Sequence, residues 1–200
     1  MRSDFLTVVL FAALSGLPAF ATGANNAISH PIIESAFSPD QGAEKLVLKN
    51  IASAERTLRV AAYSFTSPII AKALIAAKRR GVDVKVLVDD KRNQGKSSIA
   101  ALNLLLMADI PTRTISTYAM HHDKYIISDA TNVQTGSYNY SPTAATSNSE
   151  NVLVIWNNPD LAAAYTNHWN SRWNQGTQVQ VSTYHHDTLN RPGFRGGWLV

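Results

Sequence analysis

The chain has 200 residues and a mass of 21.8 kDa, which suits one globular domain with a single core. Hydrophobic residues make up 45% and charged residues 16%, a composition that excludes an intrinsically disordered chain. The formal net charge of +4 is compatible with nucleic acid or an anionic lipid as partner and identifies neither. The absence of cysteine excludes disulfides, thiolate metal sites and a cysteine nucleophile.

Residues 1–21 have the pattern of a secretory signal peptide. Arg2 is followed by an apolar run over residues 5–14, and Ala-Phe-Ala at 19–21 matches the small-x-small pattern of a cleavage site. We therefore expect cleavage after Ala21 and a periplasmic or secreted protein. The alternative is an uncleaved N-terminal membrane anchor, although the apolar run is short for a bilayer span. Residues 22–31 are polar and are expected to be a linker.

Strand and helix patterns alternate from residue 32 onward. The first half predicts strands at 32–37, 58–65 and 82–89, and helices at 41–54 and 67–80. Ser67-Pro68 has the pattern of an N-cap followed by a first-turn proline, and Gly81 stands where a helix often ends in a left-handed residue.

The second half predicts one helix, four strands and a closing helix, at 98–108, 112–116, 123–128, 133–138, 151–156 and 159–174. Strands separated by helices imply the α/β class, here an α-β-α sandwich around a mixed, mainly parallel sheet. An aromatic stripe in the closing helix (Leu161, Tyr165, Trp169, Trp173) has the spacing of a core face. We expect a domain over 32–176 and a loosely ordered tail over 177–200.

The residues that carry chemistry lie between 120 and 151. His122, Lys124 and Asp129 have the spacing H-x-K-x-x-x-x-D. If residues 122–128 form a strand, His122 and Lys124 point to one face and Asp129 to the other, because strand side chains alternate.

A second polar group follows on the next predicted strand. Ser137 and Asn139, within the sequence Gly-Ser-Tyr-Asn, share one face of that strand, and Glu150 comes 11 residues after Asn139. Two neighbouring strands would then bring an imidazole, an ammonium, a hydroxyl and an amide to one patch.

This set of groups suits phosphoryl transfer. An imidazole can attack phosphorus and leave again near neutral pH, and the Lys124 ammonium supplies a fixed charge for the phosphate oxygens. No metal-ligand spacing such as H-E-x-x-H occurs, and His185-His186-Asp187 in the tail lacks evident partners. We therefore expect neither a metal site nor a cofactor.

The constellation resembles the HKD motif of the phospholipase D superfamily. Six fixed residue types at fixed offsets should recur by chance with a probability on the order of 10⁻⁶. The likeness extends over residues 32–176, through Ala62-Tyr63-Ser64-Phe65-Thr66 and Trp173-Asn174-Gln175-Gly176. This region resembles the small secreted bacterial endonucleases of the Nuc-like branch, with the phospholipase D-like fold.

The resemblance implies a role for each residue of the motif. His122 would be the nucleophile that forms a phosphohistidine, and Lys124 would hold the phosphate oxygens. Ser137 and Asn139 would line the phosphate site. Asp129 would be chiefly structural, in agreement with its predicted place on the opposite face of the strand.

The resemblance also implies an orienting acid and a second subunit. Glu150 matches the acidic residue that orients the histidine, although an ordinary surface acid would look the same. Active sites of this family need two HKD motifs, and this chain has one, since no second H-x-K occurs. We therefore expect a homodimer in which the second His122 is the general acid, working without a metal ion.

Three functions remain open at this point. The leading one is a non-specific endonuclease on DNA or RNA, since the phosphate is the same in every sequence. The alternative is a phospholipase D that hydrolyses the headgroup ester of phospholipids such as phosphatidylcholine. The third is a non-catalytic accessory that binds DNA or a membrane surface. A polar loop carries three basic residues, Lys91, Arg92 and Lys96. The loop either binds the phosphate backbone of a polyanion or is a solvent-exposed loop with no binding role.

Overall fold

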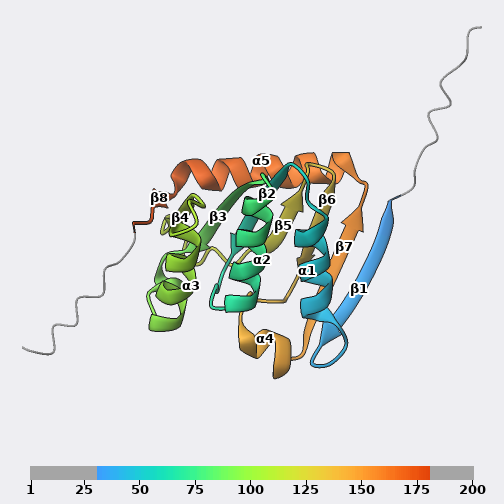
Figure 1. Ribbon diagram of the computed structural model, residues 1–200, viewed down its shortest axis with the longest axis horizontal. Helices are drawn as coiled ribbons and strands as arrows, with labels where there is room; N and C mark the ends of the chain where they lie inside the picture. The colour runs from blue at the N-terminus through green and yellow to red at the C-terminus, as the bar shows by residue number, and fades with distance from the viewer. Residues whose placement is uncertain (1–30, 181–200) are drawn as a thin grey trace, which may run out of the picture.

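A mixed sheet of eight strands runs through the computed structural model, which describes residues 31–180 (Figure 1). The predicted signal peptide, residues 22–30 of the predicted linker and residues 181–200 of the predicted tail lie outside that range. The strand order across the sheet is β1-β7-β6-β5-β2-β3-β4-β8. In chain order the strands are β1 Ile32–Ser38, β2 Thr57–Ala62, β3 Asp83–Asp89, β4 Thr112–Ile115, β5 Lys124–Ser128, β6 Asn132–Gly136, β7 Glu150–Trp156 and β8 Thr177–Gln178.

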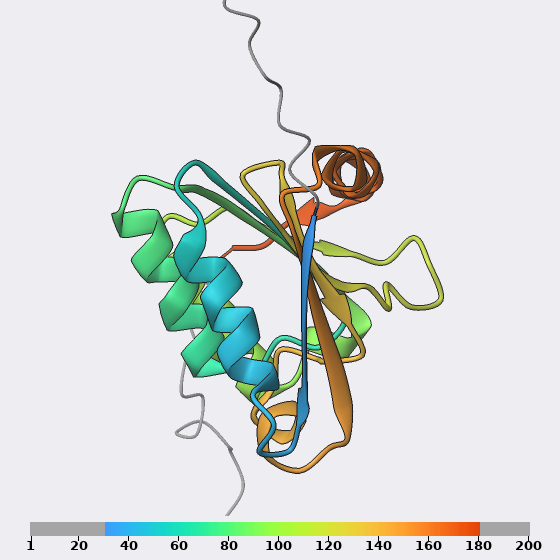
Figure 2. The same ribbon diagram turned by 90° about the vertical axis from the view of Figure 1, so that its right-hand side faces the viewer.

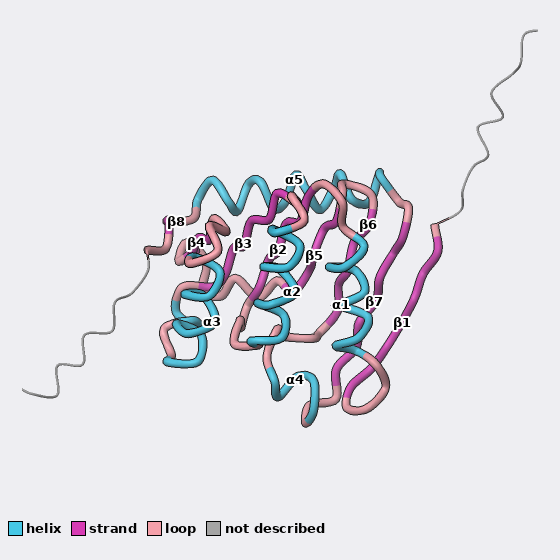
Figure 3. Tube along the Cα trace, viewed as in Figure 1, coloured by secondary structure: helices cyan, strands magenta, loops and turns pink. Residues whose placement is uncertain are grey.

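The sheet is mixed as expected, but it is not mainly parallel. Only β2, β3 and β4 pair in parallel, whereas β1 with β7, β7 with β6, β6 with β5, β5 with β2 and β4 with β8 are antiparallel. The reason lies in the connections: β4 to β5 and β5 to β6 contain no helix (Figure 3). Parallel neighbours need a crossover, whereas a short turn joins antiparallel ones.

Helices cover both faces of the sheet, which confirms the α-β-α sandwich (Figure 2). One layer consists of α1 Ala43–Ser53, α2 Pro68–Arg79 and α3 Lys96–Leu106, and α5 Pro159–Gln175 covers the other face. The short elements η1 Lys91–Asn93 and α4 Pro142–Thr146 were not predicted. No helix within residues 31–180 is long and apolar enough to cross a membrane.

The ends of α2 match the sequence signals. The Ser67 hydroxyl accepts a hydrogen bond from the Ile70 backbone N–H at 3.2 Å, and Pro68 occupies the first helical position. Gly81 follows the helix with a φ of 95°, a left-handed conformation that glycine adopts without strain.

Two apolar cores lie on the two faces of the sheet. The larger one is between the sheet and the helices α1 to α3. The smaller one joins Tyr125, Ile127 and Val133 to α5, where Trp169 is buried and donates a hydrogen bond to the Val60 carbonyl at 3.0 Å. The aromatic stripe of α5 is therefore core, as its spacing predicted.

The first residues of the predicted tail belong to the sheet. Thr177 and Gln178 form β8 and pair with Thr114 and Arg113 of β4. The chain therefore remains ordered for a few residues beyond Gly176, and the sheet gains an edge strand that the sequence did not predict.

Candidate active site

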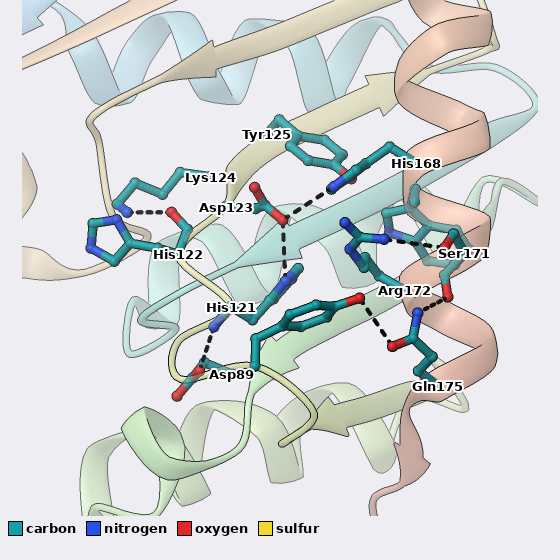
Figure 4. Close-up of polar contacts among 12 residues, drawn as sticks. Asp89, His121, His122, Asp123, Lys124, Tyr125, His168, Ser171, Arg172 and Gln175 are labelled. Atoms are coloured by element: carbon teal, nitrogen blue, oxygen red, sulfur yellow. Dashed lines mark hydrogen bonds and ion pairs between the residues drawn. The ribbon is translucent and has the colours of Figure 1, made fainter.

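His122 and Lys124 lie at one end of the central strands, and Asp129 lies at the other end. β5 begins at Lys124 and pairs antiparallel with β2 and β6, so its first residue lies beside the last residues of both neighbours. His122 precedes the strand, as in the predicted strand 123–128, so the condition that a strand begins at residue 122 is not met. Figure 4 nevertheless shows His122 and Lys124 together on one side of the segment, with Asp123 turned toward α5.

His122 and Lys124 are in contact through the backbone of His122. The Lys124 ammonium donates a hydrogen bond to the His122 carbonyl at 2.7 Å, while the His122 side chain is exposed and Lys124 is buried. Burial lowers the pKa of Lys124, and the negative charges of Asp123 and Glu150 partly offset that effect. A buried cation therefore lies directly beside an accessible imidazole.

Tyr63 completes this part of the site, and the sequence analysis did not select it as a functional residue. Its ring lies 4.4 Å from the His122 ring, and the Lys124 ammonium lies 5.1 Å from the centre of the Tyr63 ring. Tyr63 follows directly after β2, so a polar residue at the carboxyl end of a central strand was the available signal.

Ser137 and Glu150 are hydrogen bonded to each other. The Ser137 hydroxyl donates to Glu150 at 2.6 Å and accepts from the Asn151 backbone N–H at 3.0 Å. The second carboxylate oxygen of Glu150 accepts from the Asn148 amide at 2.9 Å. Both oxygens of Glu150 thus have partners within the chain other than His122, and its orienting role stays a prediction.

Gly136 allows β6 and β7 to approach closely at the start of the Gly-Ser-Tyr-Asn sequence. Its φ is 150°, and a Cβ atom there would lie 2.1 Å from the Asn151 carbonyl oxygen. Asn139, three residues on, is half-buried, and its amide oxygen has no hydrogen-bond partner among residues 31–180. Its contact with a phosphate stays a prediction.

Asp129 lies at the opposite end of β5 and binds the backbone at the start of β2. Its carboxylate accepts backbone N–H bonds from Glu55, Arg56 and Thr57 at 2.9, 2.7 and 2.8 Å. Burial raises the pKa of Asp129, but these three donors outweigh it and the pKa lies below its usual value. This arrangement agrees with the structural role that the resemblance implies.

A network of titratable side chains lies on the α5 side of the same segment (Figure 4). Asp123 contacts the His121 ring at 3.1 Å and lies 4.0 Å from the His168 ring, whose other nitrogen is 2.8 Å from the Tyr125 hydroxyl. The hydrogen bond with His121 lowers the pKa of Asp123 more than burial raises it. The sequence analysis missed this network, because it forms only when α5 packs on β5.

One pocket is lined by His122, and a second is lined by Tyr63. The first, of about 440 Å³, is lined by His122 and Lys124, by Asp123, Tyr125 and His168 of the network, and by Tyr165 of α5. The other, of about 310 Å³, is lined by Tyr63, Lys91, Arg92 and their neighbours. Lys96, the third predicted basic residue, is the first residue of α3 and does not line either pocket.

No metal site is evident within the described part of the chain. Residues 31–180 contain no group of three or more histidine, aspartate or glutamate side chains placed to hold a metal ion. In the Asp123 network the carboxylate contacts the imidazoles of His121 and His168, and the His168 imidazole also contacts the Tyr125 hydroxyl.

Comparisons with known proteins identify the family. Residues 47–173 match the family described as "Cardiolipin synthase, PLD-like domain". The chain is 34% identical over 145 residues to a phospholipase D of Rickettsia bellii, covering 72% of this chain and 71% of that protein. It is 30% identical over 145 residues to a mitochondrial cardiolipin hydrolase of Xenopus laevis, covering 72% of this chain and 64% of that protein.

Among solved structures, Nuc from Salmonella typhimurium, a phospholipase D family member, is similar in sequence and in fold. It is 49% identical with a TM-score of 0.75, and the match covers 76% of this chain and 99% of the Nuc chain. The chain therefore belongs to the phospholipase D superfamily of phosphodiesterases and, within it, to the branch of Nuc.

Proposed function

We propose that this protein is an endonuclease that hydrolyses the phosphodiester bonds of DNA or RNA through a covalent intermediate on His122. The observation that carries the proposal is the exposed imidazole of His122 beside the buried ammonium of Lys124, at a pocket of about 440 Å³ that both residues line. The 49% identity to Nuc supports a nuclease.

The reaction has two steps in this proposal. A ring nitrogen of His122 attacks the phosphorus, a P–N bond forms, and the bond from phosphorus to the leaving oxygen breaks. The Lys124 ammonium stabilises the negative charge on the non-bridging oxygens, and a general acid gives the leaving oxygen its proton. Water then attacks the phosphorus, the P–N bond breaks, and the same group takes a proton from the water.

A second copy of the chain supplies that general acid in our proposal. The chain has one H-x-K sequence, and the His122 side chain is exposed, so a partner subunit has access to it. The partner's own His122 would donate the proton. Sedimentation at active concentrations is expected to show a dimer, and an active monomer would contradict this arrangement.

The proposed place of action is the periplasm or the outside of the cell. The proposal rests on the signal-peptide pattern of residues 1–21. N-terminal sequencing of the exported protein is expected to begin at Thr22, and a retained Met1 would indicate the membrane-anchor alternative.

A phospholipase D activity is the second candidate. It is supported by the names of the relatives in Rickettsia and Xenopus and by the description of the matched family. The chemistry of the two candidates is the same, so His122 and Lys124 do not distinguish them.

Incubation of the protein with plasmid DNA and with phosphatidylcholine vesicles, both in EDTA, tests the proposal. We expect nicking and linearisation of the plasmid, little release of choline, and no turnover by the His122→Asn variant. Choline release without plasmid cleavage would favour the phospholipase. Binding of either substrate without turnover would indicate the non-catalytic accessory.

A further inference from the structure

The turn that follows β3 is fixed to the residues that follow β2. Asn93, the last residue of η1, is buried, and its amide group donates to the carbonyls of Tyr63 and Asp89, both at 2.7 Å. Its amide oxygen accepts the Phe65 backbone N–H at 2.9 Å. Two of these hydrogen bonds, to Tyr63 and from Phe65, therefore fix the position of η1 relative to Tyr63, and the third closes the turn on Asp89.

One buried carboxylate joins this turn to the segment that carries His122. Asp89 accepts the Arg92 backbone N–H at 2.7 Å with one oxygen and the His121 backbone N–H at 2.8 Å with the other. Asp89 is only 4% exposed, and Figure 4 shows its link to His121. The residue preceding His122 and the residue Arg92 are thus held by the same side chain.

The turn presents two cations to the pocket that Tyr63 lines. Lys91 and Arg92 are exposed and line the pocket of about 310 Å³, together with Tyr63, Asp89, Ala119 and Met120. The Arg92 guanidinium carbon is 5.9 Å from the centre of the Tyr63 ring, which is 4.4 Å from the His122 ring. Since both distances end on Tyr63, the guanidinium lies within about 10 Å of His122.

The charge of this pocket suits an anion. Asp89 is the one acid among its lining residues, and both oxygens of its carboxylate accept backbone N–H bonds. Among residues 31–180 no acidic side chain forms an ion pair with Lys91 or Arg92, and Arg92 also lies over the Tyr63 ring. An arginine in a fixed position is well suited to hold two oxygens of one phosphate.

We propose that Lys91 and Arg92 form a subsite for a second phosphate, one that flanks the phosphate attacked by His122 on the same strand. This inference rests on the proposed nuclease function and deepens it. Consecutive phosphates of one strand are separated by more than the roughly 3.4 Å rise along the helix axis, and the neighbouring phosphate still falls within the limit of about 10 Å. A substrate with a single phosphate occupies the reaction centre and leaves this subsite empty.

Two pairs of substrates, each measured with the wild type and with three single variants, test the subsite. The first pair is thymidine 5′-(4-nitrophenyl phosphate) with a free 3′-hydroxyl and the same ester with a 3′-phosphate. A second pair is thymidine 3′-(4-nitrophenyl phosphate) with a free 5′-hydroxyl and the same ester with a 5′-phosphate. It places the added phosphate on the other side of the reacting phosphate along the strand. We expect the added phosphate to raise kcat/KM about tenfold in one pair, the gain of one charge-assisted hydrogen-bonded contact.

The variants separate this subsite from a general charge effect. Arg92→Gln and Lys91→Gln should each reduce the gain from the added phosphate, whereas Lys72→Gln, an equal charge change on the exposed face of α2, should keep it. No gain in either substrate pair, or a full gain in both subsite variants, would overturn the subsite. Failure of the wild type to hydrolyse the one-phosphate ester would instead count against the proposed chemistry.

A binding measurement tests the subsite independently of turnover. In the His122→Asn background, binding of a single-stranded oligothymidylate should weaken with salt. The logarithm of the association constant should fall with the logarithm of the salt concentration, with a slope of about −0.7 for each phosphate contact. Adding Arg92→Gln should reduce that slope by about 0.7, and adding Lys72→Gln should leave it within error. Equal slopes for the two double variants would contradict the subsite.

Discussion

The Lys124 ammonium donates a hydrogen bond to the backbone carbonyl of His122 at 2.7 Å, so one side chain supplies charge and also holds the backbone of the proposed nucleophile. An ammonium has three donors, and one of them is used in this contact. Within residues 31–180 the ammonium has no other hydrogen-bond acceptor, so in the proposed mechanism its remaining donors bind phosphate oxygens. Lys124 therefore connects the position of the imidazole to the electrostatics of the site.

Replacing Lys124 should impair the chemical step more than substrate binding. For Lys124→Met we expect a fall in kcat of about 10²- to 10³-fold, the usual effect of losing one donor to a transition-state oxyanion. Steady-state kinetics on a nitrophenyl phosphodiester measures the change. Lys85→Met, on strand β3, which β2 separates from β5, is the matched control, and a similar loss there would remove the specific role.

Asp129 should matter for stability. Asp129→Ala leaves three backbone N–H groups without their acceptor, which we expect to lower the free energy of unfolding by about 1–3 kcal/mol. Because the pKa of Asp129 is lower in the folded state, its contribution is present at neutral pH and is lost as the pH falls through the folded pKa, below 3.8. Urea unfolding measures the free energy of unfolding of Asp129→Ala and, for comparison, of Glu55→Ala at an exposed neighbouring position.

Gly136→Ala should disturb the site through the backbone. The new Cβ would overlap the Asn151 carbonyl oxygen, so β6 and β7 must separate where Ser137 meets Glu150. We expect a lower melting temperature together with reduced kcat. Gly95→Ala, where a Cβ meets nothing within 4 Å, is the control, and equal behaviour of the two variants would disprove this explanation.

His168 should make stability sensitive to mild acid. Burial lowers the pKa of His168, and the charge of Asp123 only partly offsets this effect. The unfolded chain therefore takes up a proton at a higher pH than the folded chain, so stability should fall as the pH drops below about 6.5. Melting temperatures of wild type and His168→Gln between pH 7.5 and 5.5 test this, and the variant should show the smaller decline.

The elements that local signals define were predictable. Ser67, Pro68 and Gly81 mark the ends of α2, and the structure uses each of them as expected. The directions of the strands were harder to predict than the ends of the helices. β5, β6 and β7 are joined without crossover helices, and only the short connections between them indicate that they are antiparallel. The five-residue α4 and two-residue β8 are too short for a periodic pattern to reveal.

The candidate site was predictable where the motif is contiguous in sequence. His122, Lys124, Ser137 and Glu150 come from one stretch of 29 residues, and the sheet brings them to one edge. The prediction that His122 and Lys124 share a face assumed a strand from residue 122, whereas β5 begins two residues later. The ring contact between Tyr63 and His122 depends on the pairing of β2 with β5, which a single sequence does not specify.

Asp89 and His168 illustrate a second limit. Asp89 ends β3 and meets the backbone of His121, 32 residues away, only through the packing of two loops. His168 lies on α5 and contacts the Tyr125 hydroxyl, 43 residues earlier in the chain. Such contacts have no short-range pattern, so these residues were found only in the three-dimensional structure.

The central claim is that His122 forms a covalent bond to phosphorus. Rapid acid-free quenching of the protein with 5′-labelled oligonucleotide, followed by peptide mass spectrometry, tests this directly. We predict a nucleotidyl adduct that is labile in acid and stable in base, located on His122 and absent in His122→Asn. Turnover with no adduct at any time point, or an adduct on a different residue, would contradict the account.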